Sequence, residues 1–143
     1  PNFNFSTDII VGFCGETEKQ FQNTYNIFKK MKPAMAYIAK YSSRPGTLAA
    51  RMILDSVPLQ IKKERHQRLT RLLRKTAKEN MAKEAGNILE VLVDTWLPQE
   101  KECLGKTRNF KIVRFKSEKS LIGQFVNAKI TRVREFELEG ELI

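Results

Sequence analysis

STDIIVGFCGET, residues 6–17, decides the fold of the first half of the chain. Its β-branched run at residues 9–11 is typical of a buried strand, because every side chain in the run is apolar. Two glycines within the next five positions, residues 12–16, indicate a tight loop directly after that strand. The segment therefore predicts a strand followed by a loop at its carboxyl end, the place where parallel sheets commonly carry functional groups.

Signals for a helix and a second strand follow this loop. Thr17 and Gln20 have the spacing of a capping box, and apolar residues then recur every three or four positions as far as Pro33. Residues 34–41 are typical of a buried strand, so residues 7–41 form a strand–helix–strand unit of a parallel sheet. Such a unit leaves a sheet face and an edge exposed, and we expect preceding strands to cover them.

The loops after both strands hold residues with functional chemistry. In the first loop, Gly12 permits close backbone approach, and Glu16 lies at the helix start, where free N–H groups point outward. In the second loop, residues 41–47, Arg44 precedes a Pro-Gly turn that would fix its guanidinium toward a carboxylate or a phosphate. The first loop matches neither a phosphate loop nor a dinucleotide fingerprint. From the residues alone, an ordinary surface turn remains the alternative for both loops.

Positive charge is concentrated in one short stretch. The chain of 143 residues has a net charge of +10, and its hydrophobic fraction of 41% is sufficient for a packed core. Residues 60–80 carry eight lysines and arginines against two glutamates. This concentration favours a polyanionic partner, with nucleic acid as the first candidate and a membrane surface as the second. The alternative is a helix face that is only solvated.

Cysteine and histidine are too few for a metal site of common design. Cys14 and Cys103 are 89 positions apart, and His66 is the single histidine. The chain cannot by itself supply a cysteine-ligated metal or iron–sulfur site. We expect Cys14 to be a small loop residue and His66 a solvated helix residue. No apolar run approaches the roughly 20 residues of a membrane-spanning helix, so we expect a cytoplasmic protein without a membrane partner.

A long helix and a separate all-β unit are predicted for the remaining sequence. The helix begins after Ser56 and Pro58 and ends near Lys83, with Gly86 as its terminator. One narrow face of this helix is apolar, and cations occupy the other faces. This pattern suggests a strut whose apolar face is packed and whose other faces are exposed to solvent. From Gly86 onward the hydrophobic period changes to two, and about 60 residues of short strands fit a small closed barrel of the oligonucleotide-binding (OB) type.

The predicted barrel has one basic segment and one acidic strand. Four glutamates alternate along residues 135–141 and predict an acidic outer side that a phosphate backbone should avoid. The basic segment 106–114 is therefore the better RNA surface. Phe110 within it is either a base-stacking ring or a core residue. Trp96 is expected to pack at a strand end.

The chain resembles the carboxyl-terminal part of the radical S-adenosylmethionine methylthiotransferase family. The resemblance is carried in order by STDIIVGFCGETEKQF, YSSRPGT, VPLQIKKERHQRL, GKTRNFKIVRF and LIGQFVNAKI. It implies a fold of class α/β plus all-β: the end of a TIM-like radical-SAM barrel at residues 1–57, a basic linking helix at 58–85, and an RNA-binding TRAM domain, a small OB-like β-barrel, at 86–143. Cys14 departs from the family pattern, which commonly has proline there.

By the same resemblance, the parent enzyme methylthiolates an N6-modified adenosine near the anticodon of tRNA. It would use S-adenosylmethionine and two [4Fe-4S] clusters. The cluster cysteines of the family are absent here, so we expect no catalytic residue in this chain and no activity from it alone. Two alternatives stay open: a methylthiotransferase that acts on a ribosomal protein, and a non-catalytic RNA-binding module.

The resemblance also implies two sets of site residues. Gly12, Glu16 and Arg44 would line one side of the S-adenosylmethionine pocket. The tRNA anticodon stem-loop would be held by the basic segment, through Lys106, Arg108, Phe110, Lys111 and Arg114. We expect the protein to act as a monomer.

Overall fold

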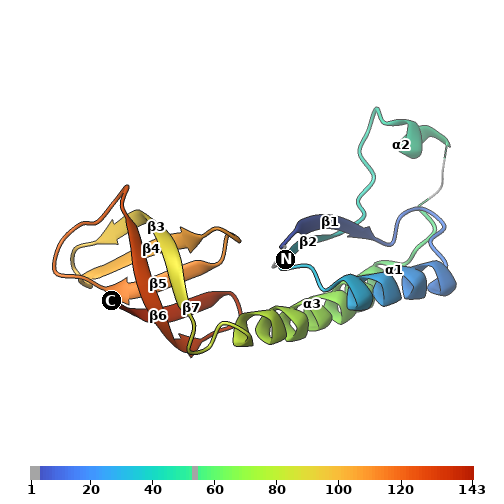
Figure 1. Ribbon diagram of the computed structural model, residues 1–143. Coiled ribbons are helices and arrows are strands. Elements are labelled where there is room, and N and C mark those ends of the chain that lie inside the picture. The colour runs from blue at the N-terminus through green and yellow to red at the C-terminus, as the bar shows by residue number, and fades with distance from the viewer. Residues whose placement is uncertain (1–3, 53–54) are drawn as a thin grey trace. The chain divides into compact units, whose positions relative to one another are not determined.

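The computed structural model describes residues 4–52 and 55–143, which fold into two compact units (Figure 1). The first unit comprises Phe5–Thr76, and the second, the barrel unit, contains Ala77–Ile143. Helix α3 (Leu59–Ala82) begins in the first unit and ends in the second. Within the described residues, no helix is both long enough and apolar enough to cross a membrane.

The first unit has the predicted strand–helix–strand order. Strand β1 (Ser6–Val11) leads through a loop to helix α1 (Glu18–Met31), and β2 (Met35–Lys40) follows. The two strands pair in parallel, with Ser6 opposite Met35 and Val11 opposite Lys40. The capping box at the start of α1 is confirmed, because Gln20 N donates to Thr17 Oγ1 and Gln20 Oε1 accepts from Thr17 N. A short helix, α2 (Leu48–Met52), was not predicted.

The core of the first unit lies between the strands and two helices. Both α1 and the first part of α3 lie on the same side of the strand pair (Figure 1). Buried apolar side chains from all four elements form this core: Val11, Phe21, Phe28, Ala36, Leu69, Leu72 and Leu73. On the other sheet face, Ile10 and Tyr37 are exposed. The expected uncovered sheet face is therefore confirmed for the described residues.

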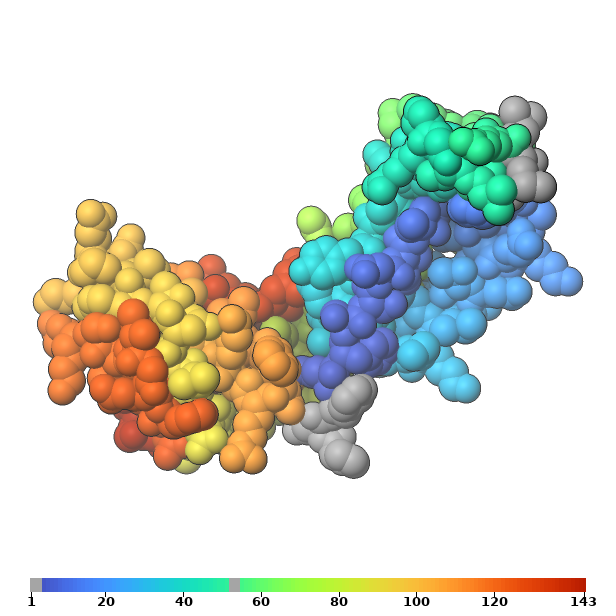
Figure 2. Space-filling view, turned by 90° about the horizontal axis from the view of Figure 1, so that it is seen from above, coloured from blue at the N-terminus to red at the C-terminus, as the bar shows by residue number. Residues whose placement is uncertain are grey.

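The barrel unit is a closed five-stranded barrel, as predicted. Its strands are β3 (Ile88–Leu97), β4 (Glu102–Thr107), β5 (Ile112–Lys116), β6 (Phe125–Val133) and β7 (Glu137–Leu142). They pair in the order β3-β4-β5-β7-β6, and β6 closes onto β3. All pairs are antiparallel except β5 with β7. In the space-filling view the yellow, orange and red segments of this unit pack into one continuous body (Figure 2).

Alternation along the strands fills the barrel interior. Inward strand positions are occupied by Val91, Val93, Cys103, Val113, Phe115, Ala128, Ile130 and Leu138, and Leu121, from the segment before β6, adds to the same core. Trp96, next to the last residue of β3, is partly buried against this core, as expected for a strand end. Phe110 is outside the core and strongly exposed, which excludes the core interpretation of this residue.

Helix α3 has the predicted length, but its polar faces are not all exposed to solvent as predicted. Lys62 and Arg65 are each only 4% exposed, and His66 is half-buried with Nε2 3.0 Å from the carbonyl oxygen of Ile38. The expectation that these residues are solvated was wrong. Its physical reason is that acids and carbonyl groups of the neighbouring loops satisfy the buried polar ends, while the aliphatic stems pack.

Candidate functional site

The loop after β1 is closed by one glutamate. Glu16 Oε2 accepts a hydrogen bond of 2.6 Å from the backbone N–H of Gly12, and Glu16 N donates to the carbonyl oxygen of Phe13. Gly12 and Gly15 have positive φ angles of 71° and 74°, which strain residues with a Cβ. The loop is therefore a fixed turn whose shape depends on the carboxylate of Glu16.

Arg65 of α3 holds that carboxylate from the other side. Its Nη1 donates to Glu16 Oε2 at 2.8 Å and to the Glu16 carbonyl oxygen at 2.9 Å. The Arg65 side chain is 5% exposed, and its guanidinium lies over the ring of Phe21. Within the described residues, Arg65 Nε is buried without a hydrogen-bond partner. A charge buried this deeply requires its partner, so the loop and the helix are tied together.

Lys62, one turn earlier on α3, connects the loops that follow both strands. Its Nζ donates to both carboxylate oxygens of Asp55, at 2.6 and 2.7 Å, and to the carbonyl oxygen of Tyr41 at 3.2 Å. Its aliphatic stem lies against Gly12, where a Cβ would stand 2.3 Å from Lys62 Cγ. We call Lys62 and Arg65 the α3 clamp, because together they fix the carboxyl-terminal loops of β1 and β2.

Arg44 does not join this network. It lies in the loop after β2, and its carbonyl oxygen accepts hydrogen bonds from the N–H and the hydroxyl of Thr47. Its side chain is exposed and forms no ion pair with any described residue. The structure thus brings Gly12 and Glu16 together through direct contacts and leaves the guanidinium of Arg44 at the surface.

The cysteines do not form a metal site. Cys14 is half-buried and Cys103 lies in the barrel core, and the two are not joined in a disulfide. A hydrogen bond with Cys14 raises the pKa of the Tyr41 hydroxyl. Across residues 4–52 and 55–143, no three histidine, cysteine or acidic side chains gather as metal ligands. The residues present therefore do not fit an iron–sulfur cluster.

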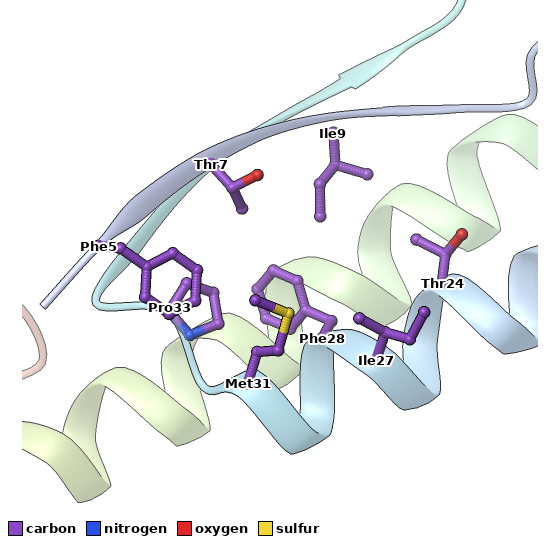
Figure 3. Close-up of a pocket in the computed structure, with 8 residues that line it drawn as sticks. All are labelled: Phe5, Thr7, Ile9, Thr24, Ile27, Phe28, Met31 and Pro33. Carbon is purple, nitrogen blue, oxygen red and sulfur yellow. The ribbon is translucent and has the colours of Figure 1, made fainter.

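An apolar groove of about 190 Å³ lies between β1 and α1. Figure 3 shows Thr7 and Ile9 pointing from the strand toward Thr24, Ile27 and Phe28 of the helix. Its lining has few polar atoms that could orient a polar ligand. The groove lies on the helix-covered side of β1, and none of its lining residues belongs to the loop network.

The turn between β4 and β5 presents exposed side chains. Thr107 organises it, because Thr107 N donates to the Lys111 carbonyl oxygen and Thr107 Oγ1 accepts from Lys111 N. Between them, the Arg108 side chain is 87% exposed and Phe110 is 82% exposed. Phe110 adopts a left-handed backbone conformation with φ of 59°. The turn therefore displays one ring and one guanidinium to solvent.

The four basic residues of the predicted RNA surface lie in two different settings. Lys106 and Arg108 are exposed and lie 2.9 and 3.4 Å from Asp94 and Glu90 of β3, respectively. The other two form ion pairs within the barrel unit. Lys111 is buried against Glu84, and Arg114 lies between Glu102 and Glu137 at 2.7 Å from each.

Some glutamates of the acidic strand β7 form ion pairs with arginines that lie elsewhere in the sequence. Glu137 pairs with Arg114, and Glu139 pairs with Arg132 and Arg134. These arginines come from β5, β6 and the turn after β6, so they pair with two of the four glutamates from both neighbouring strands. The outer side of β7 is thus less strongly acidic than the alternating glutamates predicted.

The α3 clamp was not predicted from the sequence, although its residues follow a recognisable pattern. Positions 62, 65, 69, 72, 73 and 76 follow the spacing of one helix face, and all six are buried. The cations at the first two positions continue the apolar stripe toward the helix start. Because lysine and arginine are usually solvated, the sequence pattern did not indicate that positions 62 and 65 belong to this buried face.

Comparison with known proteins finds a family model that matches the barrel unit and relatives that match the whole chain. Residues 82–143 match the family model described as "TRAM domain". Over 144 aligned positions that include the whole chain, it is 45% identical to the tRNA-2-methylthio-N(6)-dimethylallyladenosine synthases of Bacillus thuringiensis and Bacillus anthracis, and 41% identical to that of Bacillus licheniformis. The chain is homologous to the carboxyl-terminal part of these synthases. It spans 28% of the length of these curated relatives.

Charge pairs of the TRAM domain shift the pKa values of two carboxyl groups. Hydrogen bonds from Arg114 and Lys116 hold the pKa of Glu102 below its usual range. Burial raises the pKa of Glu84, but hydrogen bonds from Lys111 and Asn87 outweigh it and bring the net pKa below its usual value. Both carboxylates are therefore more strongly stabilised in the folded domain than in the unfolded chain.

A pair of glycine substitutions tests the contact between Lys62 and the first loop. Gly15→Ala should cost about 1–2 kcal/mol, because its φ is positive but no atom lies within 4 Å of the added Cβ. Gly12→Ala has the same backbone cost and also displaces Lys62, so we expect a further 1–3 kcal/mol, roughly as for overpacking. Chemical denaturation of both variants measures the difference. Equal costs would contradict the packing of Lys62 on Gly12.

The stability of the TRAM domain should depend on Glu102 in acid. Because the folded-state pKa is lowered, the stabilisation is complete above the unfolded value, about 4.3, and is lost as pH falls through the folded value. Glu102→Gln should lower the unfolding free energy by about 1 kcal/mol at pH 7 and weaken its dependence on pH below about 4.3. Glu118→Gln is the control, since the side chains of Glu118 and its partner Lys101 are 82% and 61% exposed. Identical pH profiles for Glu102→Gln and the parent chain would refute this role of Glu102.

Proposed function

We propose that this chain is the carboxyl-terminal part of a tRNA-modifying methylthiotransferase whose TRAM domain binds tRNA. The proposal is supported by identity of 41–45% to synthases named for a modified adenosine of tRNA and by the match to the TRAM family. The substrate would be an N6-modified adenosine near the anticodon, and the bound RNA the anticodon stem-loop. The parent enzyme is a radical S-adenosylmethionine enzyme in this proposal.

The first unit would then be the end of a larger α/β barrel, whose other strands cover its exposed sheet face. In this proposal the loops after β1 and β2 border the S-adenosylmethionine site. S-adenosylmethionine, when bound, supplies a methyl group and a radical precursor. Gly12 allows the positive φ of the loop and leaves room for the Lys62 stem, Glu16 keeps the loop in shape, and Arg44 provides an exposed guanidinium suited to a carboxylate. Since no cluster ligands are present, we assign this chain no step in radical generation.

For tRNA binding, the proposed direct contacts are Lys106, Arg108 and Phe110. These three are exposed around the β4–β5 turn, where they can reach phosphates and an unpaired base. Lys111 and Arg114 would act indirectly, because their ion pairs fix the turn and the strand that follows it. The domain would thus combine backbone contacts with stacking on one ring.

Phe110 is the observation that carries this proposal. A phenylalanine that is 82% exposed contributes little to packing, and its left-handed backbone costs roughly 1–2 kcal/mol relative to glycine. Neither property benefits the folded domain. Backbone strain combined with exposed apolar surface is typical of a residue retained for ligand contact. An exposed ring beside two cations matches the stacking platforms of proteins that bind single-stranded nucleic acid.

Substitution of Phe110 should separate stability from binding. Phe110→Gly relieves the backbone strain, so the TRAM domain should be equally stable or more stable by up to about 1 kcal/mol. Affinity for an anticodon stem-loop should fall by about 1–3 kcal/mol, because a stacked base loses its platform. Thermal melting and fluorescence anisotropy measure the two effects.

Ile122→Ala is the matched control for this experiment. It removes another exposed apolar side chain from a different loop of the same barrel, and its affinity should equal that of the parent chain. Unchanged RNA affinity of Phe110→Gly would contradict the assignment of Phe110. If the parent chain shows no affinity for the stem-loop at low salt, the proposed function itself fails.

A further inference from the structure

The cations of α3 fall into three groups with different surroundings. Lys62 and Arg65 form the buried α3 clamp, and Arg68 pairs with Glu18 on α1 while lying over the ring of Phe21. Four others in the first unit are exposed, and we call them the α3 cation row: Lys63, Arg71, Arg74 and Lys75. The high positive charge of the helix therefore reaches solvent through this row.

The row occupies one side of the helix. At 3.6 residues per turn its four positions fall within about a third of the helix circumference, and at 1.5 Å per residue they extend over about 18 Å. The buried residues Leu69, Leu72 and Leu73 lie on the opposite side, in the core of the first unit. A fixed helix thus displays a linear array of positive charge.

No acid neutralises this array within residues 4–52 and 55–143. None of the four forms an ion pair there. Glu64 lies within the same third of the helix circumference, but its carboxylate is 3.9 Å from Arg68. On the TRAM domain the situation differs, because Lys106 and Arg108 both have an acidic neighbour on β3. Four like charges in one line repel each other, and a polyanion would relieve that repulsion.

We propose that the α3 cation row is a second RNA-binding surface that contacts the phosphate backbone. This inference rests on the proposed function and adds a site outside the TRAM barrel. The row would supply affinity that is independent of sequence, through release of counterions from neutralised phosphates. Two arginines among the four can each contact a phosphate with a bidentate fork.

The surroundings of the row favour RNA over a membrane surface. A helix that binds in the membrane interface inserts an apolar face next to its cations. On α3 the apolar face is already buried against α1 and the two strands. The exposed neighbours of the row, Gln60 and Gln67, are polar. The exposed apolar side chain of Leu59 stands at the first position of α3, before the row begins. A rigid basic face with polar neighbours matches a phosphate backbone.

Removal of the row should change the salt dependence of RNA binding. The test variant is K63Q/R71Q/R74Q/K75Q, because glutamine keeps a similar helix propensity without charge. The matched control is K19Q/K29Q/K30Q/K40Q, which removes four exposed lysines from α1 and β2 of the same unit. Anisotropy titrations of an anticodon stem-loop at several salt concentrations give the slope of log affinity against log salt. Far-ultraviolet circular dichroism verifies that both variants are folded.

We expect the row variant to lower the magnitude of this slope by about 3, since each lost contact contributes roughly 0.7–0.9. Its affinity at low salt should fall at least tenfold more than that of the control. The charge-preserving variant R71K/R74K should keep the slope of the parent chain.

Equal losses in the row variant and the control would overturn the inference, because net charge alone would then explain both. Unchanged binding by the row variant would overturn it as well, while leaving the proposed function of the TRAM domain intact. Binding of the parent chain to anionic lipid vesicles with equal affinity, lost together with RNA binding in the row variant, would reject the assignment to RNA. A parent chain that binds no RNA would reject both proposals.

Discussion

The buried ion pair between Arg65 and Glu16 is the constraint on which the first unit depends. A guanidinium that is almost fully excluded from water is tolerated only with a partner, and here the partner is the residue that closes the loop after β1. Loop shape, helix position and strand spacing are therefore fixed together. Lys62 extends the same constraint to the loop after β2 through Asp55 and the carbonyl oxygen of Tyr41.

One helix consequently performs two physical tasks with the same residue types. On its inner side, cations with long aliphatic stems pack against glycine and phenylalanine and meet acids and carbonyl groups at their ends. On its outer side, the α3 cation row keeps its charge in solvent. The difference is set by helical position alone, since residues 62 and 63 are both lysines. Net charge in the sequence is thus a poor measure of the charge available to a partner.

Local patterns were sufficient for the parallel strand pair, for α1 and α3 and for the closed barrel, but not for the short helix α2. The capping box at Thr17, the apolar periodicity of α1 and the alternation in β3 each report their own surroundings. The pairs that decide which charges are available join distant positions, such as Glu16 with Arg65, or Glu84 with Lys111. The pattern within one segment does not show which acidic residue of a distant segment will pair with a given cation. The burial of Lys62, Arg65 and Lys111 could therefore not be predicted from local patterns. The exposure and strained backbone of Phe110 likewise follow from the turn geometry imposed by Thr107.

A double-mutant cycle tests the central claim that the α3 clamp holds the loop after β1. The cycle uses Glu16→Gln, Arg65→Met and the double variant, and native-state amide exchange in β1 and α1 reports the local unfolding free energy of the first unit. The more exposed pair of Glu18 and Arg68, whose side chains are 60% and 30% exposed, serves as a reference and should couple by about 1 kcal/mol or less. For Glu16 and Arg65, a buried pair, we expect each single change to cost about 3–5 kcal/mol and the coupling to exceed about 1.5 kcal/mol. A coupling no larger than that of the reference pair would contradict the account.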